Sequence, residues 1–141
     1  MIISMSLLLI RIILAYIFIP FGWQKLMAGQ PKWLWLGTQM QNFGIYFLPV
    51  AWGFMAACAE FFGGISILLG LGTRIGAFFI VCVMIVALVM HITNGDPFWS
   101  VWSFPLMLLV FALVLIVMGG GKFSLDHYLV QGIKNNNLEQ Q

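Results

Sequence analysis

The chain has 141 residues, of which 62% are hydrophobic and 7% are charged, and its formal net charge is +2. Soluble domains carry about 25% charged residues, so the composition excludes a protein with a mostly polar surface and predicts an integral membrane protein. We expect a single domain over residues 1–141, and a net charge this small gives no indication of nucleic-acid binding.

Four apolar runs are long enough to cross a bilayer as helices, since a membrane-spanning helix needs about 20 residues. In chain order they cover residues 3–23, 47–70, 75–92 and 104–117. Gly70 and Gly72 lie in the very short connection between the second and third runs, where they allow a tight reversal. The predicted fold is therefore an all-α bundle of four transmembrane helices, in which the second and third are antiparallel neighbours.

The first run contains Arg11 and the second contains Glu60, although a charge in hydrocarbon costs about 3 kcal/mol or more unless it faces a partner or a cavity. At a rise of about 1.5 Å per residue, Arg11 lies about 12 Å and Glu60 about 15 Å from the inner ends of their runs. We therefore predict an Arg11–Glu60 ion pair inside the bundle. One interpretation is a structural pair that fixes the helix register, and the other is a site for a proton, an ion or a polar ligand.

Small residues surround Glu60 in the second run. Spacing of the small-x-x-x-small type lets membrane helices approach each other closely. We expect helix contacts at Gly53, Ala56, Ala57, Gly63 and Gly64. Because two of these residues share a helix face with Glu60, its carboxylate should point into a helix contact rather than into lipid.

Polar and aromatic residues gather where the first, third and fourth runs reach the outer side of the predicted bundle. They are Trp23, Gln24, Lys25, His91, Asp96, Trp99 and Trp102. This mixture is typical of a small outward-facing ligand pocket, but it is also typical of the aromatic belt at a membrane interface. No metal site is recognised, since His91 and His127 fall on opposite sides, and no catalytic residue can be assigned.

An even number of spans places both termini on the same side of the membrane. Arg74, Lys122 and Lys134 would lie on that side and Lys25 and Lys32 on the other, which favours cytoplasmic termini. The six tryptophans all fall at or between helix ends on the opposite, outer side. They are Trp23, Trp33, Trp35, Trp52, Trp99 and Trp102.

The last part of the chain changes character after the fourth run. Residues 124–133 predict a short amphipathic helix at the inner membrane surface, with Ser124 as its N-cap and Asp126 in its first turn. We expect residues 135–141 to be disordered.

Three segments carry recognisable motifs, namely "LLLIRIILAYIFIPFGWQKL", "AEFFGGISILLGLGTRIGA" and "GGGKFSLDHYL". In this order they resemble the DoxX family of small bacterial four-helix membrane proteins over nearly the whole chain. The matching positions are Arg11, Phe18, Gly22, Lys25, Leu26, Glu60, Gly63, Gly64, Gly70, Leu71, Thr73, Arg74, Gly119, Gly121, Lys122, Ser124, Leu125, Asp126 and Leu129. The chain departs from the family at Phe21, where many members have a histidine, and in "SVWSFPLM", where many have an acidic residue.

The resemblance implies a protein of the bacterial inner membrane that is linked to thiol, thiosulfate–quinone or oxidative-stress systems. We expect the membrane subunit or anchor of such a redox assembly, with a soluble redox enzyme as partner. It would be non-catalytic alone, or an oxidoreductase subunit. A quinone-like or other small hydrophobic ligand would bind at the outer residues or at the Arg11–Glu60 level. The alternatives are a small-solute or proton-coupled transporter that uses Glu60, and a purely structural scaffold. The glycine faces also permit a homodimer.

Overall fold

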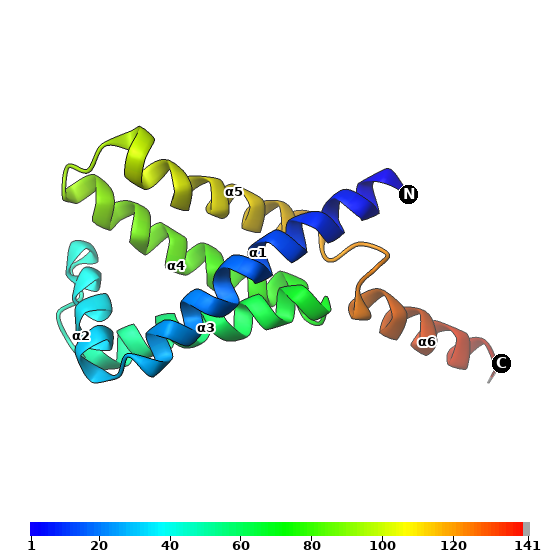
Figure 1. Cartoon of the computed structure of the whole chain (residues 1–141). Helices are drawn as coiled ribbons and strands as arrows, with labels where there is room; N and C mark the ends of the chain where they lie inside the picture. The colour runs from blue at the N-terminus through cyan, green and yellow to red at the C-terminus, as the bar shows by residue number, and fades with distance from the viewer. Residues whose placement is uncertain (140–141) are drawn as a thin grey trace.

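A computed structural model describes residues 1–139, which form helices joined by short connections (Figure 1). The elements in chain order are α1 (Ile2–Met27), α2 (Gln30–Thr38), the 3-10 helix η1 (Gln39–Phe43), α3 (Pro49–Leu69), α4 (Thr73–Thr93), the π-helical turn η2 (Phe98–Trp102), α5 (Ser103–Met118) and α6 (Leu125–Glu139).

Four helical stretches are long and apolar enough to cross a membrane, namely Ile2–Met27, Pro49–Leu69, Thr73–Thr93 and Phe98–Met118. They correspond one to one with the four predicted runs, and the predicted all-α four-helix membrane fold is confirmed. The first and last stretches are longer than predicted, because α1 continues to Met27 and η2 extends the fourth span at its beginning.

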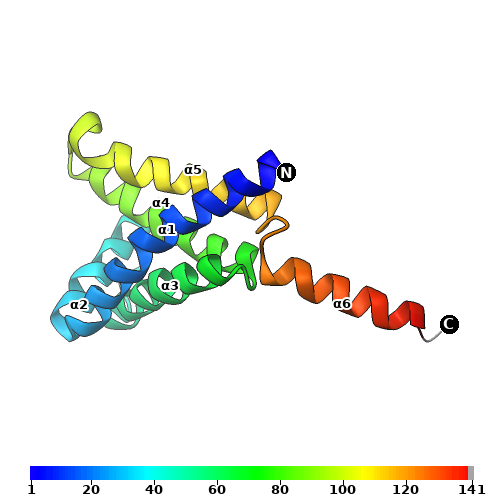
Figure 2. The same cartoon turned by 45° about the vertical axis from the view of Figure 1, so that its right-hand side comes forward.

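The four long helices alternate in direction, so their ends gather at two opposite ends of the bundle (Figures 1 and 2). One end holds α2, η2, the last turns of α1 and the first turn of α3, and these elements carry all six tryptophans. We call it the tryptophan end. The opposite end holds the α3–α4 turn and the start of α6, and we call it the Arg11 end.

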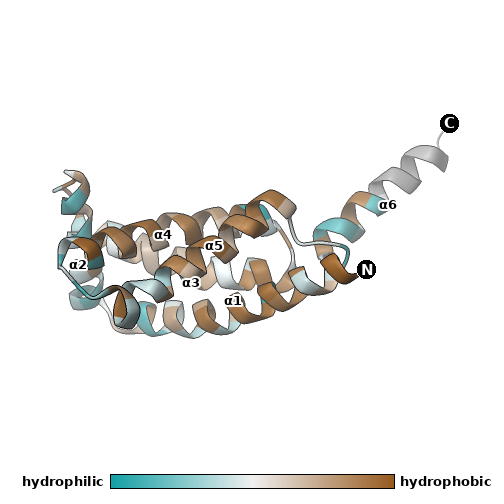
Figure 3. Cartoon of the chain, turned by 90° about the horizontal axis from the view of Figure 1, so that it is seen from above, coloured by the Kyte–Doolittle hydropathy of each residue, from teal (hydrophilic) through white to brown (hydrophobic). Residues whose placement is uncertain are grey.

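A core of tightly packed side chains lies along the centre of the bundle. Leu14, Phe18, Ile67, Ile80 and Leu115 are almost completely buried there. The outward faces of the four long helices are also mainly apolar (Figure 3). Apolar residues both inside and outside require a hydrocarbon environment, since water would not solvate the outer surface.

The C-terminal helix α6 projects away from the bundle at the Arg11 end (Figure 2). Ser124 caps it as predicted, because its Oγ accepts a hydrogen bond of 3.3 Å from the His127 amide. The helix is longer than predicted and continues to Glu139, so the expected disorder of residues 135–139 is wrong. Residues 140–141 lie outside the described part of the chain.

Candidate ligand-binding crevice

Glu60 is buried in the bundle and forms an ion pair with Lys25. The Lys25 Nζ lies 2.6 Å from both carboxylate oxygens, and Glu60 is only 1% exposed. Lys25 belongs to the last turn of α1 and enters from the tryptophan end. A buried carboxylate with two short charge-assisted contacts is held in one orientation.

The prediction that Arg11 pairs with Glu60 is wrong. The fully buried Arg11 guanidinium instead donates four hydrogen bonds to backbone carbonyls at the Arg11 end. Its partners are Ile67 O at 2.8 Å, Leu68 O at 2.8 Å, Gly120 O at 3.1 Å and Phe123 O at 2.8 Å. Two of these carbonyls belong to the last turn of α3, where the regular amide partner four residues later is missing.

The register of α1 against α3 explains this error. Glycines bring the two backbones close, with Gly22 of α1 against Phe61 and Gly64 of α3 against Phe18. Because the helices are antiparallel, this register places Lys25 beside Glu60 and Arg11 beside the α3–α4 turn. The depth estimate assumed that both helices begin at the same inner level, whereas the first residues of α1 continue beyond the end of α3 (Figure 1).

At the α3–α4 turn, two oppositely charged side chains bind the free backbone groups of the two helix ends. Arg11 binds carbonyls at the C-terminus of α3, and the Asp126 carboxylate accepts hydrogen bonds from the Gly72 and Thr73 amides at 2.8 and 3.1 Å, at the start of α4. Both charges are favourable with respect to the helix dipoles. The predicted ligand role of Arg11 has no support in this geometry, and the residue joins α1, α3 and the tail.

The small residues of α3 lie at three different helix contacts. Gly53 packs on Trp33 of α2, Gly63 on the backbone of Gly76 in α4, and Gly64 on α1. Ala57 is completely buried, while Ala56 lines a crevice. The contact at Gly63 keeps α3 and α4 close near their turn, and from there the two helices diverge toward the tryptophan end (Figure 1).

A crevice of about 900 Å³ occupies the space between the diverging helices. The end nearest the α3–α4 turn is formed by Gly63, Ser66 and Gly76, and the α2–η1 segment covers the tryptophan end with Trp35, Leu36, Gln39 and Met40. Most of the wall is apolar or aromatic. Its polar contributors include Lys25, Glu60, Gln39 and His91, so the ion pair faces a cavity as well as a helix contact.

One edge of the crevice borders the lipid-facing surface. Phe62 of α3 and Phe78 of α4 line it and are 60% and 54% exposed, and Cys82 is also exposed. Cys58 lines the crevice from α3 and is half-buried. An apolar molecule could therefore pass from the bilayer into the crevice without crossing water.

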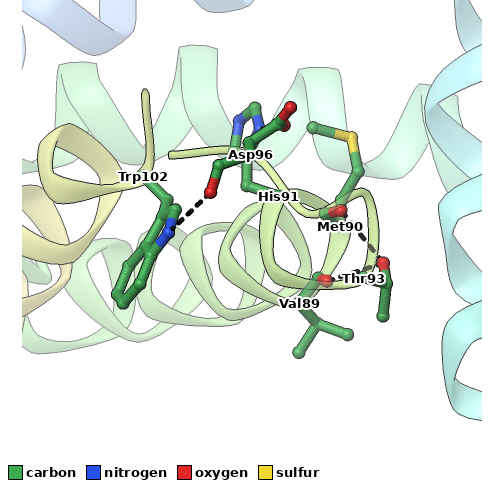
Figure 4. A network of polar contacts seen from close by, with 6 residues as sticks. All are labelled: Val89, Met90, His91, Thr93, Asp96 and Trp102. Carbon is green, nitrogen blue, oxygen red and sulfur yellow. Dashed lines mark hydrogen bonds and ion pairs between the residues drawn. The ribbon is translucent and has the colours of Figure 1, made fainter. Parts of the chain in front are cut away.

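The predicted outer pocket is only partly assembled. Of its seven residues, Lys25 and His91 line the crevice. The His91 Nδ1 lies 2.7 Å from Asp96 Oδ2, and Trp102 Nε1 donates to the Asp96 carbonyl at 3.1 Å, which fixes the α4–η2 loop (Figure 4).

The other three residues of that set lie elsewhere. Trp23 packs on the Phe61 ring with centroids 5.6 Å apart, Gln24 is exposed, and Trp99 is 88% exposed. They are placed as expected for an interfacial belt.

Sequence reasoning missed the Lys25–Glu60 pair and the position of the crevice. A signal for the pair was present, because Lys25 follows Gly22 by three residues and lies on the same helix face. A glycine that brings α1 against α3 therefore brings the lysine with it. The crevice itself depends on the divergence of α3 and α4 and on the position of α2, which no local pattern encodes.

The crevice chemistry suits a small lipophilic ligand that has a polar head. Largely apolar pockets with a few well-placed polar groups are typical ligand sites. Lys25 has three N–H donors, and two contacts to Glu60 leave one for a ligand oxygen. Among the described residues, no group of three or more histidine, cysteine or acidic side chains could hold a metal ion.

Comparisons with known proteins agree with the motifs. The DoxX family model matches residues 6–92 of the chain. The protein named "Putative oxidoreductase CatD" of Bacillus subtilis (strain 168) is 30% identical over 132 residues, which cover 93% of this chain and 92% of that protein. No solved structure matches the chain.

Proposed function

We propose that this protein is the membrane subunit of a redox assembly and that it binds a quinone-like ligand in the α3–α4 crevice. The proposal starts from the family, because the chain belongs to the DoxX family. A redox association at the family level agrees with the name of its Bacillus subtilis relative. The soluble partner would be a redox enzyme that exchanges electrons with the bound ligand.

The Lys25–Glu60 pair at the crevice wall is the observation that carries this proposal. A pair used only for packing has no need of a cavity beside it, whereas this pair faces about 900 Å³ of largely apolar space. Lys25 would donate its remaining N–H to a ligand oxygen, and Glu60 would hold the ammonium group in place. The surrounding aromatic and aliphatic walls would exclude water and strengthen that hydrogen bond.

The open edge at Phe62 and Phe78 supports a ligand that comes from the bilayer. A quinone head would lie against the ion pair, and its isoprenoid tail would leave between α3 and α4 into the lipid. This arrangement needs no soluble carrier for the ligand.

The orientation we propose places the Arg11 end in the cytoplasm and the tryptophan end on the outer side of a bacterial inner membrane. Arg74 and Lys122 belong to the Arg11 end, which agrees with the bias of basic residues toward the cytoplasm. Both termini would then be cytoplasmic.

Quinone binding by the purified protein in lipid nanodiscs tests the proposal. We expect saturable binding of a short-chain ubiquinone or menaquinone, and an affinity at least about tenfold lower in Lys25→Met, because a charge-assisted hydrogen bond is lost. Lys32→Met is the matched control, since Lys32 lies over the Trp35 ring, 4.3 Å from its centroid, and does not line the crevice. Absence of binding by the native protein, or equal binding by Lys25→Met, would contradict the proposal.

A second candidate is a proton-coupled transporter, which is favoured by the buried carboxylate that borders the crevice. Transport would require flux of a solute or protons through liposomes, lost in Glu60→Gln. Redox coupling would instead appear as ligand reduction or oxidation with a partner enzyme and without flux.

A further inference from the structure

A second, smaller pocket lies at the Arg11 end, where the chain enters α1 and α6 starts (Figure 2). We call it the tail pocket. Its volume is about 370 Å³, and its lining includes Ser4 of α1, Lys122 and Phe123 of the connection before α6, and His127, Tyr128 and Gln131 of α6. Small-molecule sites typically have volumes of about 300–1,000 Å³, so the tail pocket is large enough to hold a ligand.

Hydrogen bonds to the rest of the bundle hold the walls of the tail pocket in place. The Arg11 guanidinium donates to the Phe123 carbonyl at 2.8 Å, and the Asp126 amide donates to the Gly70 carbonyl at 2.9 Å. These contacts fix the connection before α6 and the first turn of α6 against the bundle. The tail pocket is therefore a product of the fold.

The charge of the tail pocket is positive. The side chain of Lys122 is exposed and has no hydrogen-bond or ion-pair partner among the described residues. No acidic residue that the structure describes lines the pocket, and both oxygens of the Asp126 carboxylate already accept hydrogen bonds from amides at the start of α4. Tyr128 and Gln131 are exposed and add neutral donors. These groups suit a phosphate and offer no partner for the ammonium group of a zwitterionic lipid.

The position of the tail pocket favours a membrane lipid over a dissolved anion. Ser4 lies in the first turn of α1, at the end of a membrane-spanning stretch. Ile2 and Ile3 precede it and are exposed, and so are Phe123 and Leu129 on the side of the tail. A lipid whose phosphate binds here can cover these apolar side chains with its acyl chains, whereas a dissolved anion would leave them uncovered.

We propose that the tail pocket binds the phosphate of an anionic phospholipid from the membrane leaflet at the Arg11 end. Lys122 supplies the opposite charge, Tyr128 and Gln131 donate hydrogen bonds to phosphate oxygens, and the acyl chains lie against the exposed apolar residues of α1 and the tail. The bound lipid holds the start of α6 at the membrane surface. This inference goes beyond the proposed function and does not depend on it, because none of these three residues lines the α3–α4 crevice.

Native mass spectrometry of the full chain, released from detergent micelles, tests the inference. Phosphatidylglycerol and phosphatidylcholine with identical acyl chains are titrated separately. The native protein should bind its first phosphatidylglycerol about fivefold more tightly than phosphatidylcholine, which is the effect typical of one lysine beside an anionic lipid. Lys122→Gln should lose this preference and Lys122→Arg should retain it, because arginine restores the charge and the donors. Since the Lys122 side chain is exposed, both variants should unfold at the same SDS fraction as the native protein.

Arg74→Gln is the matched control for the loss of one positive charge. Arg74 is exposed at the same end, donates to the Val117 carbonyl at 3.3 Å and does not line the tail pocket. This variant should keep the native lipid preference. A loss equal to that of Lys122→Gln would show that the preference comes from the overall charge of this end, and it would overturn the inference. Equal binding of the two lipids by the native protein would overturn it as well.

A headgroup without acyl chains separates a lipid site from a site for a dissolved anion. Glycerol 1-phosphate, added at the same concentration as phosphatidylglycerol, should leave lipid binding unchanged, because it cannot cover the apolar residues around the pocket. Complete displacement of the lipid by glycerol 1-phosphate would contradict the assignment of a lipid.

Discussion

Replacing Lys25 by methionine tests whether this side chain, rather than Arg11, compensates the charge of Glu60. Methionine retains much of the apolar stem of lysine and removes the ammonium group. The Glu60 side chain is only 2% exposed, so its carboxylate would remain buried without a cation. Removing one partner of a buried ion pair costs about 3–5 kcal/mol, and we expect a loss of that size in the free energy of unfolding.

The reverse change should be milder. Glu60→Gln leaves a lysine whose side chain is 24% exposed and lies near the end of α1, where it can turn toward the membrane interface. We expect a loss of about 1 kcal/mol, which is typical of one weakened hydrogen bond. The double variant should be more stable than Lys25→Met alone, because it contains no unpaired buried charge.

Unfolding by SDS in mixed micelles, followed by circular dichroism, gives the four free energies of this cycle. The Lys25–Glu60 coupling should be about 2 kcal/mol, within the range found for residues in contact. A parallel cycle with Arg11→Met and Glu60→Gln should be additive within about 0.5 kcal/mol, since these residues do not touch. Additivity in the first cycle together with strong coupling in the second would refute the reasoning.

Three further changes test how the helices are joined. Arg11→Met removes four hydrogen bonds to carbonyls and should lower the free energy of unfolding by about 3 kcal/mol or more, measured by the same SDS titration. Asp126→Ala removes the caps of the α4 N-terminus and should cost about 1 kcal/mol and speed tryptic cleavage of α6, whereas unchanged cleavage would argue against this anchor. Gly22→Ala places a methyl group against the Phe61 backbone and should destabilise by about 1–3 kcal/mol, while Gly132→Ala, which has open space, should not.

The membrane fold was predictable because hydropathy alone determines it. Four apolar runs and the very short connection within "GLGTRIG" define the spans and the antiparallel α3–α4 pair. Backbone groups in lipid must be satisfied within helices, so each run had few alternatives. The tryptophans likewise gather at one end because interface preference acts on each residue separately.

The polar contacts were not predictable in the same way. The pairing of Glu60 depends on the register between α1 and α3, which is determined by the glycine contact at Gly22 and not by depth counted from apolar boundaries. The partners of Arg11 are backbone carbonyls. Every residue has one, so residue identity does not indicate which carbonyls Arg11 binds. The crevice requires α3 and α4 to diverge and the α2–η1 segment to lie over their open end, and hydropathy encodes neither arrangement.

Photoaffinity labelling with a quinone that carries a diazirine next to its ring tests the central claim most directly, since it maps where the head group binds. The protein would be labelled in native-like lipid, digested and analysed by mass spectrometry. The account predicts that the label lies on crevice-lining residues between 52 and 66 of α3 and between 75 and 91 of α4. Unlabelled quinone should reduce the labelling by competition, and Lys25→Met should be labelled less than the native protein. Label spread over the lipid-facing surfaces of α1 and α5, without competition, would contradict it.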